Sequence, residues 1–386
     1  MATDQPAELP TPGFLLAFLM LGHFSWDTHF MQFHKELFFE LASLGCPGLW
    51  VDERPRLRLD RAAWLRAFPN GEVIRERHSH RLVPWSVSKL RLGHRFHLPD
   101  VMVARQITRT LEALNIRRPV IFVYTPQELG VAKRVDHALS VYWTGDEVIM
   151  WGHDQLLEYV DIILAVSPRA LEHHRSLYPD KTWQVSTGVA HRMFDTIPGA
   201  AVPAELRHIP RPIAGYSGSL NLARIDAQLL RSVVDGLPAI SFALVGPQSG
   251  DLRGVLADCK NVHFIAAQPY ERVPEFLSAF DCGIVPYRLT EFNLGSNPLK
   301  VHEYLAAGLP VVSTPLPSLA VYDSLVRVAA TPEEFIQGVE KAVLEREDKD
   351  GIAQRRSAAD EYSTDKIAAR ILSIVERHIA RTNAMQ

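Results

Sequence analysis

Short apolar segments alternate with stretches of helical spacing along all 386 residues of this chain. The pattern is that of parallel α/β units, in which a buried strand is followed by a helix that covers the sheet. The first half has four segments that we predict as strands: residues 14–21, 48–51, 120–124 and 162–166. We also predict a helix at residues 29–44, where apolar residues recur at helical spacing and Gly45 follows as a C-cap.

A Pro- and Gly-rich segment divides the chain, and the alternation restarts after it. The strands predicted there are residues 213–216, 241–245, 262–265, 282–285, 310–313 and 326–328. The sequence therefore predicts an α/β fold with two Rossmann-like domains, residues 1–197 and 213–362, joined by a linker at 198–212. A last amphipathic helix within residues 363–386 is expected to pack back on the first domain. Ligands of such folds bind beyond the carboxyl ends of the strands, so we expect the site in a cleft between the two halves.

Composition excludes several classes of protein. Apolar residues make up 47% of the chain and charged residues 22%, so disorder as the main state is excluded. The apolar run at residues 14–21 is too short for a spanning helix, and Asp4 and Glu8 before it argue against a secretory signal. Three scattered cysteines exclude a disulfide framework and argue against structural zinc. We expect a cytoplasmic protein.

The charge of the chain is unevenly distributed. Residues 54–118 carry fifteen Lys or Arg against five Asp or Glu, although the net charge of the whole chain is −3. Large apolar residues such as Trp64, Phe68 and Trp85 are interleaved with these cations. This composition suits contact with anionic lipid headgroups, but it is also compatible with nucleic acid or with a solvated region whose apolar residues pack inward. We expect an anionic membrane surface as the partner of residues 54–95, at the inner face of the plasma membrane, and no nucleic acid.

A glycine-containing turn, GYSGSL, follows the first predicted strand of the second half. Small residues such as Gly218 and Ser219 allow backbone N–H groups to approach a phosphate. Arg224, six residues past Gly218, could add a charge-assisted bond to a diphosphate. The alternative is a tight turn without a ligand.

A richer motif, SNPLKVHEYLAAGLPVV, begins at Ser296. Pro298 suits a first helical turn, with Asn297 as its N-cap, and such a helix start attracts anions. Lys300 could pair with phosphate oxygens, and Glu303 could accept two hydrogen bonds from a ribose diol. The alternative is that Lys300 and Glu303 form a surface pair.

Residues 297–312 resemble the donor-site helix of GT-B glycosyltransferases, particularly those of family 4. That family has a Lys-x-x-Glu-Tyr-like core followed by Ala-x-Gly-x-Pro-Val-Val. Other segments resemble its landmarks in the same order along the chain. They are residues 165–168 and 187–191 (the end of the N-terminal domain), 215–218 (phosphate loop), 261–264 with 273–274 and 280–281 (base recognition), and 285–287 (the strand end before the donor loop).

The resemblance implies that Glu303 binds the donor ribose, Lys300 and Arg224 hold the diphosphate, and Phe264 or Ile265 contacts the base. The full donor-binding set that we expect is Gly218, Ser219, Arg224, Phe264, Tyr287, Ser296, Asn297, Lys300 and Glu303.

The sequence also departs from that family. The Glu that family-4 members usually carry eight residues before the ribose Glu is Gly295 here, and the nearest carboxylate is Glu291. The family's Asn-Gly-Val-Asp is Thr-Gly-Val-Ala at residues 187–190. Inversion and retention of the anomeric configuration therefore both stay open.

The first half is also similar to xanthan-type glucuronosyltransferases, inverting GT-B enzymes with a Val-Tyr-x-x-x-Asp stretch before a Val-Ser-Pro landmark. Here the stretch runs from Val141 to Asp146, upstream of residues 166–168. The resemblance implies that Asp146 is the general base, taking the proton from an acceptor hydroxyl as that oxygen attacks the anomeric carbon. A loop or N-cap role is the alternative for Asp146. His23 and Asp27 follow the first predicted strand and are further catalytic candidates, although Asp27 also suits an N-cap.

No histidine pair combines with cysteine or carboxylates at ligand spacing, so we predict no metal site. The expected protein is a metal-independent glycosyltransferase of hexosyltransferase type without a cofactor. It would move a sugar from a nucleoside-diphosphate sugar, of UDP or GDP type, to a glycan or lipid-linked acceptor in exopolysaccharide, capsule or cell-envelope synthesis. Two alternatives are a nucleotide-sugar 2-epimerase and a catalytically silent GT-B subunit.

Overall fold

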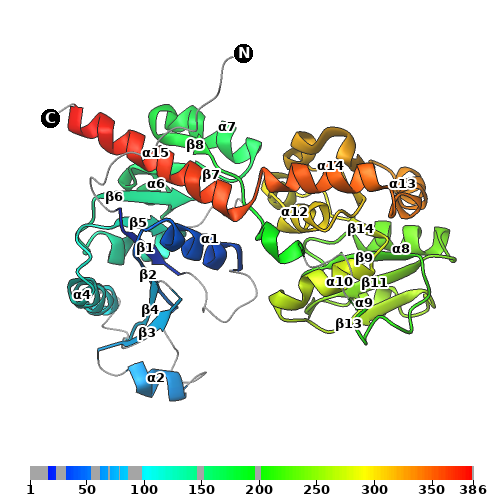
Figure 1. The fold of residues 1–386 in the computed structure, drawn as a ribbon, viewed down its shortest axis with the longest axis horizontal. Helices are drawn as coiled ribbons and strands as arrows, with labels where there is room; N and C mark the ends of the chain where they lie inside the picture. The colour runs from blue at the N-terminus through cyan, green and yellow to red at the C-terminus, as the bar shows by residue number, and fades with distance from the viewer. Residues whose placement is uncertain are drawn as a thin grey trace, which may run out of the picture. The chain divides into compact units, whose positions relative to one another are not determined.

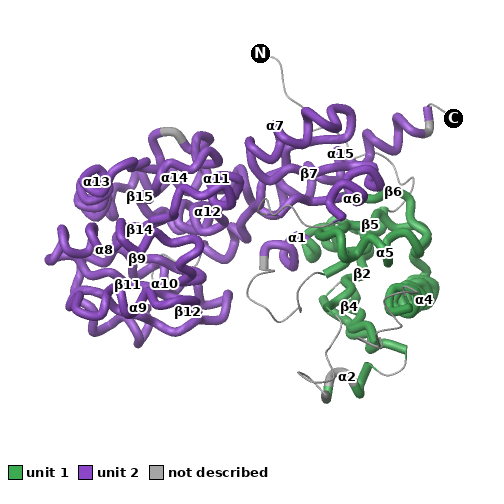
Figure 2. The backbone as a smooth tube through the Cα atoms, turned by 180° about the vertical axis from the view of Figure 1, so that it is seen from behind, with its two compact units in different colours: residues 1–26, 38–141 green, residues 27–37, 142–386 purple. Residues whose placement is uncertain are grey.

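The computed structural model describes residues 16–22, 32–53, 61–67, 70–77, 79–85, 98–145, 152–195 and 201–384. The chain forms two compact units (Figure 2), residues 1–26 with 38–141 and residues 27–37 with 142–386. The second unit holds residues on both sides of segment 198–212, and the domain boundaries expected from the sequence stay a prediction. In both units helices accompany sheets of mainly parallel strands (Figure 1).

Unit 1 is built on three fully buried parallel strands. β1 (Phe18–Leu21) pairs with both β2 (Gly48–Val51) and β5 (Val120–Val123). Each strand is a continuous apolar run because strands of a parallel sheet are buried on both faces. The predicted strand at 48–51 is therefore confirmed with its bounds.

Two further strands extend this sheet at one edge and were not predicted. β4 (Ser79–Val83) pairs with β2 in parallel, and β3 (Glu72–Glu76) pairs with β4 in antiparallel. The other elements of unit 1 are α2 (Arg61–Ala67), α4 (Leu98–Ala113), a 3₁₀ turn at Pro126–Glu128 and α5 (Leu129–Ala132). α1 (Gln32–Ser43) and β6 (Leu139–Trp143) run across the boundary between the units.

Unit 2 contains a six-stranded sheet in the order β13-β11-β9-β14-β15-β16. All of its neighbouring strands pair in parallel. The strands are β9 (Ile213–Ser217), β11 (Ser241–Val245), β13 (Val262–Ile265), β14 (Cys282–Val285), β15 (Val311–Ser313) and β16 (Val326–Val328). In chain order this is 3-2-1-4-5-6, the strand order of the Rossmann fold. The α/β prediction is confirmed for this half.

The helices of unit 2 follow its strands. Before residue 196 the helices are α6 (His153–Tyr159) and α7 (Pro168–Leu177). The strands of this part are β7 (Ile162–Ala165) and β8 (Thr182–Gln184). After residue 212 the helices are α8 (Ala227–Gly236), α9 (Leu252–Val255), α10 (Val273–Ala279), α11 (Glu291–Gly295), α12 (Leu299–Ala306), α13 (Pro332–Leu344), α14 (Lys349–Asp360) and α15 (Thr364–Ala384). Across the described ranges, the helices are too short or too polar to cross a bilayer.

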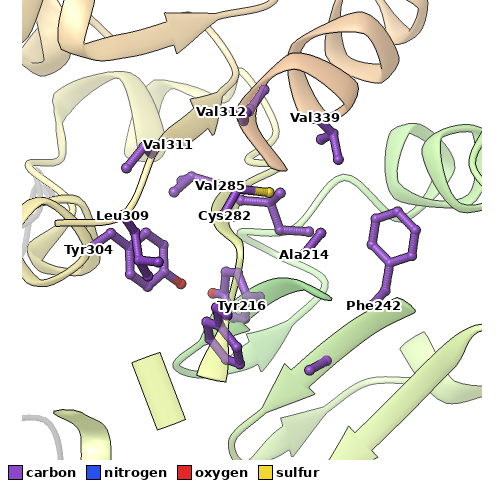
Figure 3. Packing of buried hydrophobic residues seen from close by; sticks show 14 of the residues in the cluster. Ala214, Tyr216, Phe242, Cys282, Val285, Tyr304, Leu309, Val311, Val312 and Val339 are labelled. Atoms are coloured by element: carbon purple, nitrogen blue, oxygen red, sulfur yellow. The ribbon is translucent and has the colours of Figure 1, made fainter. Parts of the chain in front are cut away.

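One large cluster of buried apolar side chains holds the six-stranded sheet and its helices together. Figure 3 shows part of it, with Tyr216 of β9 and Tyr304 of α12 among the labelled members. Both tyrosines are buried and both hydroxyls have hydrogen-bond partners, which satisfies the polar end of each ring. The core of this half therefore reaches directly to the end of β9.

Candidate functional site

The candidate donor residues gather at the carboxyl ends of β9 and β14. These two strands are neighbours, and the strand order reverses between them. In open α/β sheets such a topological switch point is where ligands bind. Gly218 follows β9 directly, and Tyr287 lies two residues after β14.

The turn after β9 needs glycine at its centre. Gly218 has a φ of +143°, a backbone conformation that other residues rarely adopt. Gly246 of the neighbouring turn has a φ of +145°, and a Cβ there would lie 1.9 Å from the Gly218 carbonyl oxygen. The turns after β9 and β11 therefore pack backbone against backbone.

Most amides of this turn already have partners. The amide of Ser217 donates to Tyr304 Oη (2.8 Å), that of Gly218 to the Val245 carbonyl (2.9 Å) and that of Leu220 to the Pro247 carbonyl (2.8 Å). In this conformation only the amide of Ser219, among residues 217–220, is left for an anion. Side chains must therefore supply most of the binding energy for a phosphate.

Lys300, in the first turn of α12, points its ammonium at this turn. Nζ donates to Tyr287 Oη at 2.6 Å and lies 5.1 Å from the ring centroids of both Tyr216 and Tyr287. A Cβ on Gly218 would be 3.3 Å from Nζ, so glycine also gives the ammonium room. Within the described ranges, Lys300 has no carboxylate within 4.0 Å. An ammonium that faces aromatic rings and lacks a counter-charge is an attractive partner for an anion.

The two tyrosines beside Lys300 have pKa values that differ in direction. Burial and the neighbouring phenols raise the pKa of Tyr216 well above its ordinary value. Burial acts in the same sense on Tyr287, but the charges of Lys300 and Arg224 outweigh it and lower the pKa of Tyr287. Positive charge is therefore concentrated at the Tyr287 hydroxyl.

Glu303 lies one turn further along α12 and is only 6% exposed. Burial raises the pKa of its carboxyl, while the charge of Lys300 and a hydrogen bond from Tyr270 act in the opposite sense. A buried carboxylate with spare acceptor sites needs hydrogen-bond donors, which a ribose diol can supply. The alternative reading, a surface pair between Lys300 and Glu303, does not hold, because Lys300 donates to Tyr287 and Glu303 is buried.

Two residues next to α12 bond within the protein. Asn297 Nδ2 donates to Ser186 Oγ (2.9 Å) and to the Val166 carbonyl (3.3 Å), and Ser296 Oγ donates to the Asn293 carbonyl (2.8 Å). The prediction that Asn297 is the N-cap of this helix is wrong: Pro298 is the N-cap and has no capping side chain. The reason is that the side-chain amide of Asn297 bonds to Val166 and Ser186, which follow β7 and β8, and not to the backbone of its own helix.

Arg224 lies beside Tyr287 at the switch point, whereas Phe264 lies on β13, two strands away from β9. The Arg224 guanidinium stacks 4.5 Å above the Phe292 ring, and the charge of Arg224 acts on Tyr287. Phe264 is half-buried at the end of β13, with the Arg253 guanidinium 4.6 Å above its ring. Arg224 precedes helix α8, whose N-cap is Asp226.

The three catalytic candidates, Asp146, His23 and Asp27, lie outside the described residues. Glu291, the carboxylate nearest to the missing family Glu, is an exposed residue that pairs with Arg169. Over the described ranges, no three His, Cys, Asp or Glu side chains converge as metal ligands would.

The sequence interpretation gave no role to Tyr216, Tyr304 or Tyr270. Tyr216 and Tyr304 bond to both ends of the glycine turn, and Tyr270 bonds to Glu303. A signal was available for two of them: Tyr216 lies inside the turn motif itself, and Tyr304 follows Glu303 directly. Tyr270 had no such signal, because its bond joins segments 33 residues apart.

Comparison with known proteins places this geometry in context. Residues 211–345 match the model of the family described as Glycosyl transferases group 1. A curated relative, the putative teichuronic acid biosynthesis glycosyltransferase TuaH of Bacillus subtilis (strain 168), is 29% identical over 189 residues. The match covers 47% of this chain and 47% of that protein, so the chain spans about half the length of the curated relative that it matches.

Solved structures resemble the chain over nearly its whole length. An alpha,alpha-trehalose-phosphate synthase (UDP-forming) from Burkholderia vietnamiensis has a TM-score of 0.67 at 12% identity, covering 96% of this chain and 99% of that one. HepE of Anabaena, solved in complex with UDP, has a TM-score of 0.62 at 11% identity, covering 94% and 100%. The predicted GT-B fold is confirmed, and the segment that carries Lys300 and Glu303 is the one that matches the group 1 glycosyltransferases.

Proposed function

We propose that this chain is a glycosyltransferase that takes its sugar from a nucleoside-diphosphate sugar bound between the glycine turn and α12. The observation that carries the proposal is the ammonium of Lys300, which has no ion pair in the described residues and faces Gly218 at a Rossmann switch point. Glu303, buried one turn away, supplies acceptors for a ribose diol. The family match over residues 211–345 supports the same function.

The first test is a thermal-shift screen with UDP, GDP, ADP, dTDP and CMP, each with and without EDTA. UDP is the first choice because one similar structure is that of a UDP-forming synthase and another was solved in complex with UDP. A ligand at 100 times its dissociation constant stabilises a protein by about 2.7 kcal/mol. The proposal predicts a selective, EDTA-insensitive shift that Glu303→Ala removes and Lys260→Ala keeps, since Lys260 is exposed just before β13, at the far end of that strand. Failure of every nucleotide to shift the wild type would overturn the proposal.

Asp146 is our proposed general base, by similarity to the xanthan-type enzymes. It follows β6 by three residues, in a segment where Thr144 Oγ1 accepts from the Val166 amide (3.1 Å). Asp146→Asn should stop sugar transfer and leave nucleotide binding intact. Unchanged transfer would remove Asp146 from the mechanism. A chain that binds nucleotide but neither transfers nor hydrolyses any donor would point to the silent subunit, and interconversion of donor epimers would point to the epimerase.

We further propose that the acceptor is a glycan or a lipid-linked sugar met at an anionic membrane surface. Support comes from α2 and β3 of unit 1, where Leu65 is 54% and Val73 49% exposed beside the exposed Arg75 and Arg77. Apolar side chains among cations are typical of peripheral membrane contact. Arg75→Ser combined with Arg77→Ser should weaken binding to phosphatidylserine vesicles by about 30-fold, at roughly 1 kcal/mol per cation. Equal binding of wild type and variant to such vesicles would contradict this assignment.

A further inference from the structure

The environment of Lys300 is more elaborate than an anion site requires. An exposed lysine on a helix start would sample many rotamers, and fixing such a long side chain costs conformational entropy. Here the side chain is half-buried between two phenol rings, each 5.1 Å from Nζ. The ammonium is therefore held in place before any donor arrives.

The hydroxyl of Tyr287 fixes the direction of that ammonium. Its oxygen accepts from Nζ at 2.6 Å, and the Tyr287 residue is packed in the core, with only 1% of its surface exposed. Backbone pairing adds to this: Tyr287 forms an antiparallel bridge with Ile225, next to Arg224. Tyr287 thus joins the end of β14 to the Lys300 side chain and to the segment that carries Arg224.

A second tyrosine beside Lys300 bonds to the glycine turn. Tyr216, whose ring centroid lies 5.1 Å from Lys300 Nζ, donates from its Oη to the Ser219 carbonyl at 2.9 Å. The Lys300 ammonium therefore lies beside one phenol that accepts its hydrogen bond and another that holds residue 219, whose amide is left for an anion.

We propose that Tyr287 is the positioning residue of the donor site: its hydroxyl holds Lys300 beside Gly218, in register with the Ser219 amide, so that both meet the diphosphate together. The ligand class is a nucleoside diphosphate, and the assignment rests on the proposed function. Tyr287 acts through Lys300 and contacts the diphosphate only indirectly. A side chain that is already ordered before the ligand binds increases affinity, because less conformational freedom is lost on binding.

The test is a double-mutant cycle on UDP affinity by calorimetry. Tyr287→Phe keeps the ring and removes the hydroxyl, and should weaken UDP about tenfold, as expected for one hydrogen bond to a charged group. In a Lys300→Ala background the same change should matter less than twofold, because the group that Tyr287 positions is gone. Binding of uridine, which lacks phosphate, should be equal in wild type and Tyr287→Phe.

A matched control is Tyr322→Phe. Tyr322 is equally buried and its hydroxyl bonds to His302 of the same helix α12, away from the glycine turn. The Tyr322→Phe variant should lose about as much stability as Tyr287→Phe and keep the UDP affinity of the wild type. If Tyr287→Phe does not fold, Tyr216→Phe removes the hydroxyl that holds the Ser219 carbonyl beside Lys300 and should weaken UDP binding about threefold.

The outcomes separate this inference from the function on which it rests. No UDP, GDP or other nucleoside diphosphate bound by the wild type would overturn both. Nucleotide bound equally by wild type and by the folded Tyr287→Phe or Tyr216→Phe variant would overturn the positioning role alone. A tenfold loss that persists in Lys300→Ala would do the same, because it would show that Tyr287 acts independently of Lys300.

Discussion

The two groups of cations that the sequence singles out differ in what surrounds them. In unit 1, several arginines of the basic stretch have carboxylate partners: Arg66 with Glu72 (3.4 Å), Arg81 with Glu76 (3.7 Å) and Asp52 (3.9 Å), and Arg118 with Asp136 (3.6 Å). In unit 2, Lys300 has tyrosines instead, with one phenol oxygen at 2.6 Å. The stretch richest in positive charge is therefore partly neutralised, whereas one lysine in an acidic half of the chain is not.

Charge density along a sequence is therefore a poor guide to where a specific anion binds. An arginine already paired with a carboxylate has part of its charge neutralised, so it attracts a phosphate less strongly than an unpaired cation does. Lys300 exchanges one neutral oxygen for a charged one, and the nearby rings favour its positive form throughout. Specific diphosphate binding is thus expected at α12, and diffuse, salt-sensitive attraction at unit 1.

The largest expected effect is at Lys300. Lys300→Ala removes the charged partner of the diphosphate and should weaken UDP on the order of 100-fold, since bonds to charged groups contribute roughly 1.5–3 kcal/mol. Calorimetry with UDP gives the number, and Lys260→Ala is the control with the same loss of charge. An affinity for UDP that Lys300→Ala leaves unchanged would break the contrast between the two groups of cations.

The next effect concerns stability rather than binding. The Arg81 side chain is 12% exposed and lies beside Asp52, whose side chain is 6% exposed. Arg81→Ser removes a cation from beside a buried carboxylate and should lower the free energy of unfolding by about 2 kcal/mol. Arg75→Ser, at an exposed position on β3, should change it by less than about 0.5 kcal/mol.

Denaturant titration of both arginine variants measures the difference. Equal stability of Arg81→Ser and Arg75→Ser would show that the ion pairs of unit 1 do not hold its arginines. In that case the basic stretch would be as available to anions as Lys300.

A pH titration sharpens the role of Glu303. Burial raises the pKa of its carboxyl, and the ribose requires the ionised form as acceptor. UDP affinity should therefore fall as the pH is lowered through that raised pKa, beginning at a higher pH than for an ordinary Glu. Glu303→Gln should bind UDP about tenfold more weakly near neutral pH and lose this acid-side decline. If the UDP affinity of Glu303→Gln declined with the same midpoint pH as that of the wild type, the titrating group would be a residue other than Glu303.

The smallest effect on binding is expected at Asn297. Its amide donates to Ser186 and Val166, so Asn297→Ala should cost about 1 kcal/mol of stability and change UDP affinity less than twofold. Thermal unfolding and calorimetry on the same sample separate these two quantities. Loss of UDP affinity without loss of stability would indicate that Asn297 contacts the donor directly.

Much of the second half could be predicted from its sequence because local signals mark each element. The strand at Val262–Ile265 has the predicted bounds, and the helix at Pro332–Leu344 has clear local signals at its start. For the helix the signals are Pro332 in the first turn and a capping box between Thr331 and Glu334. The placement of Lys300 and Glu303 one turn apart on a helix could be predicted for the same reason, because Pro298 marks where that helix begins.

Other features had no local signal. Strand β3 was missed because none of its residues is fully buried, which leaves no apolar face to detect. Helix α14 was missed because its residues are mostly polar. The bond between Asn297 and Ser186 joins residues 111 apart, and no spacing rule predicts it. The roles of Asp146, His23 and Asp27 stay predictions.

The most direct test of the account is a crystal structure with UDP bound. We predict diphosphate oxygens within hydrogen-bond distance of Lys300 Nζ and the Ser219 amide, with the ribose hydroxyls on Glu303. The Lys300 ammonium should stay over the rings of Tyr216 and Tyr287. A diphosphate bound instead by the arginines of residues 61–118, or one that leaves Lys300 on Tyr287 alone, would contradict the account.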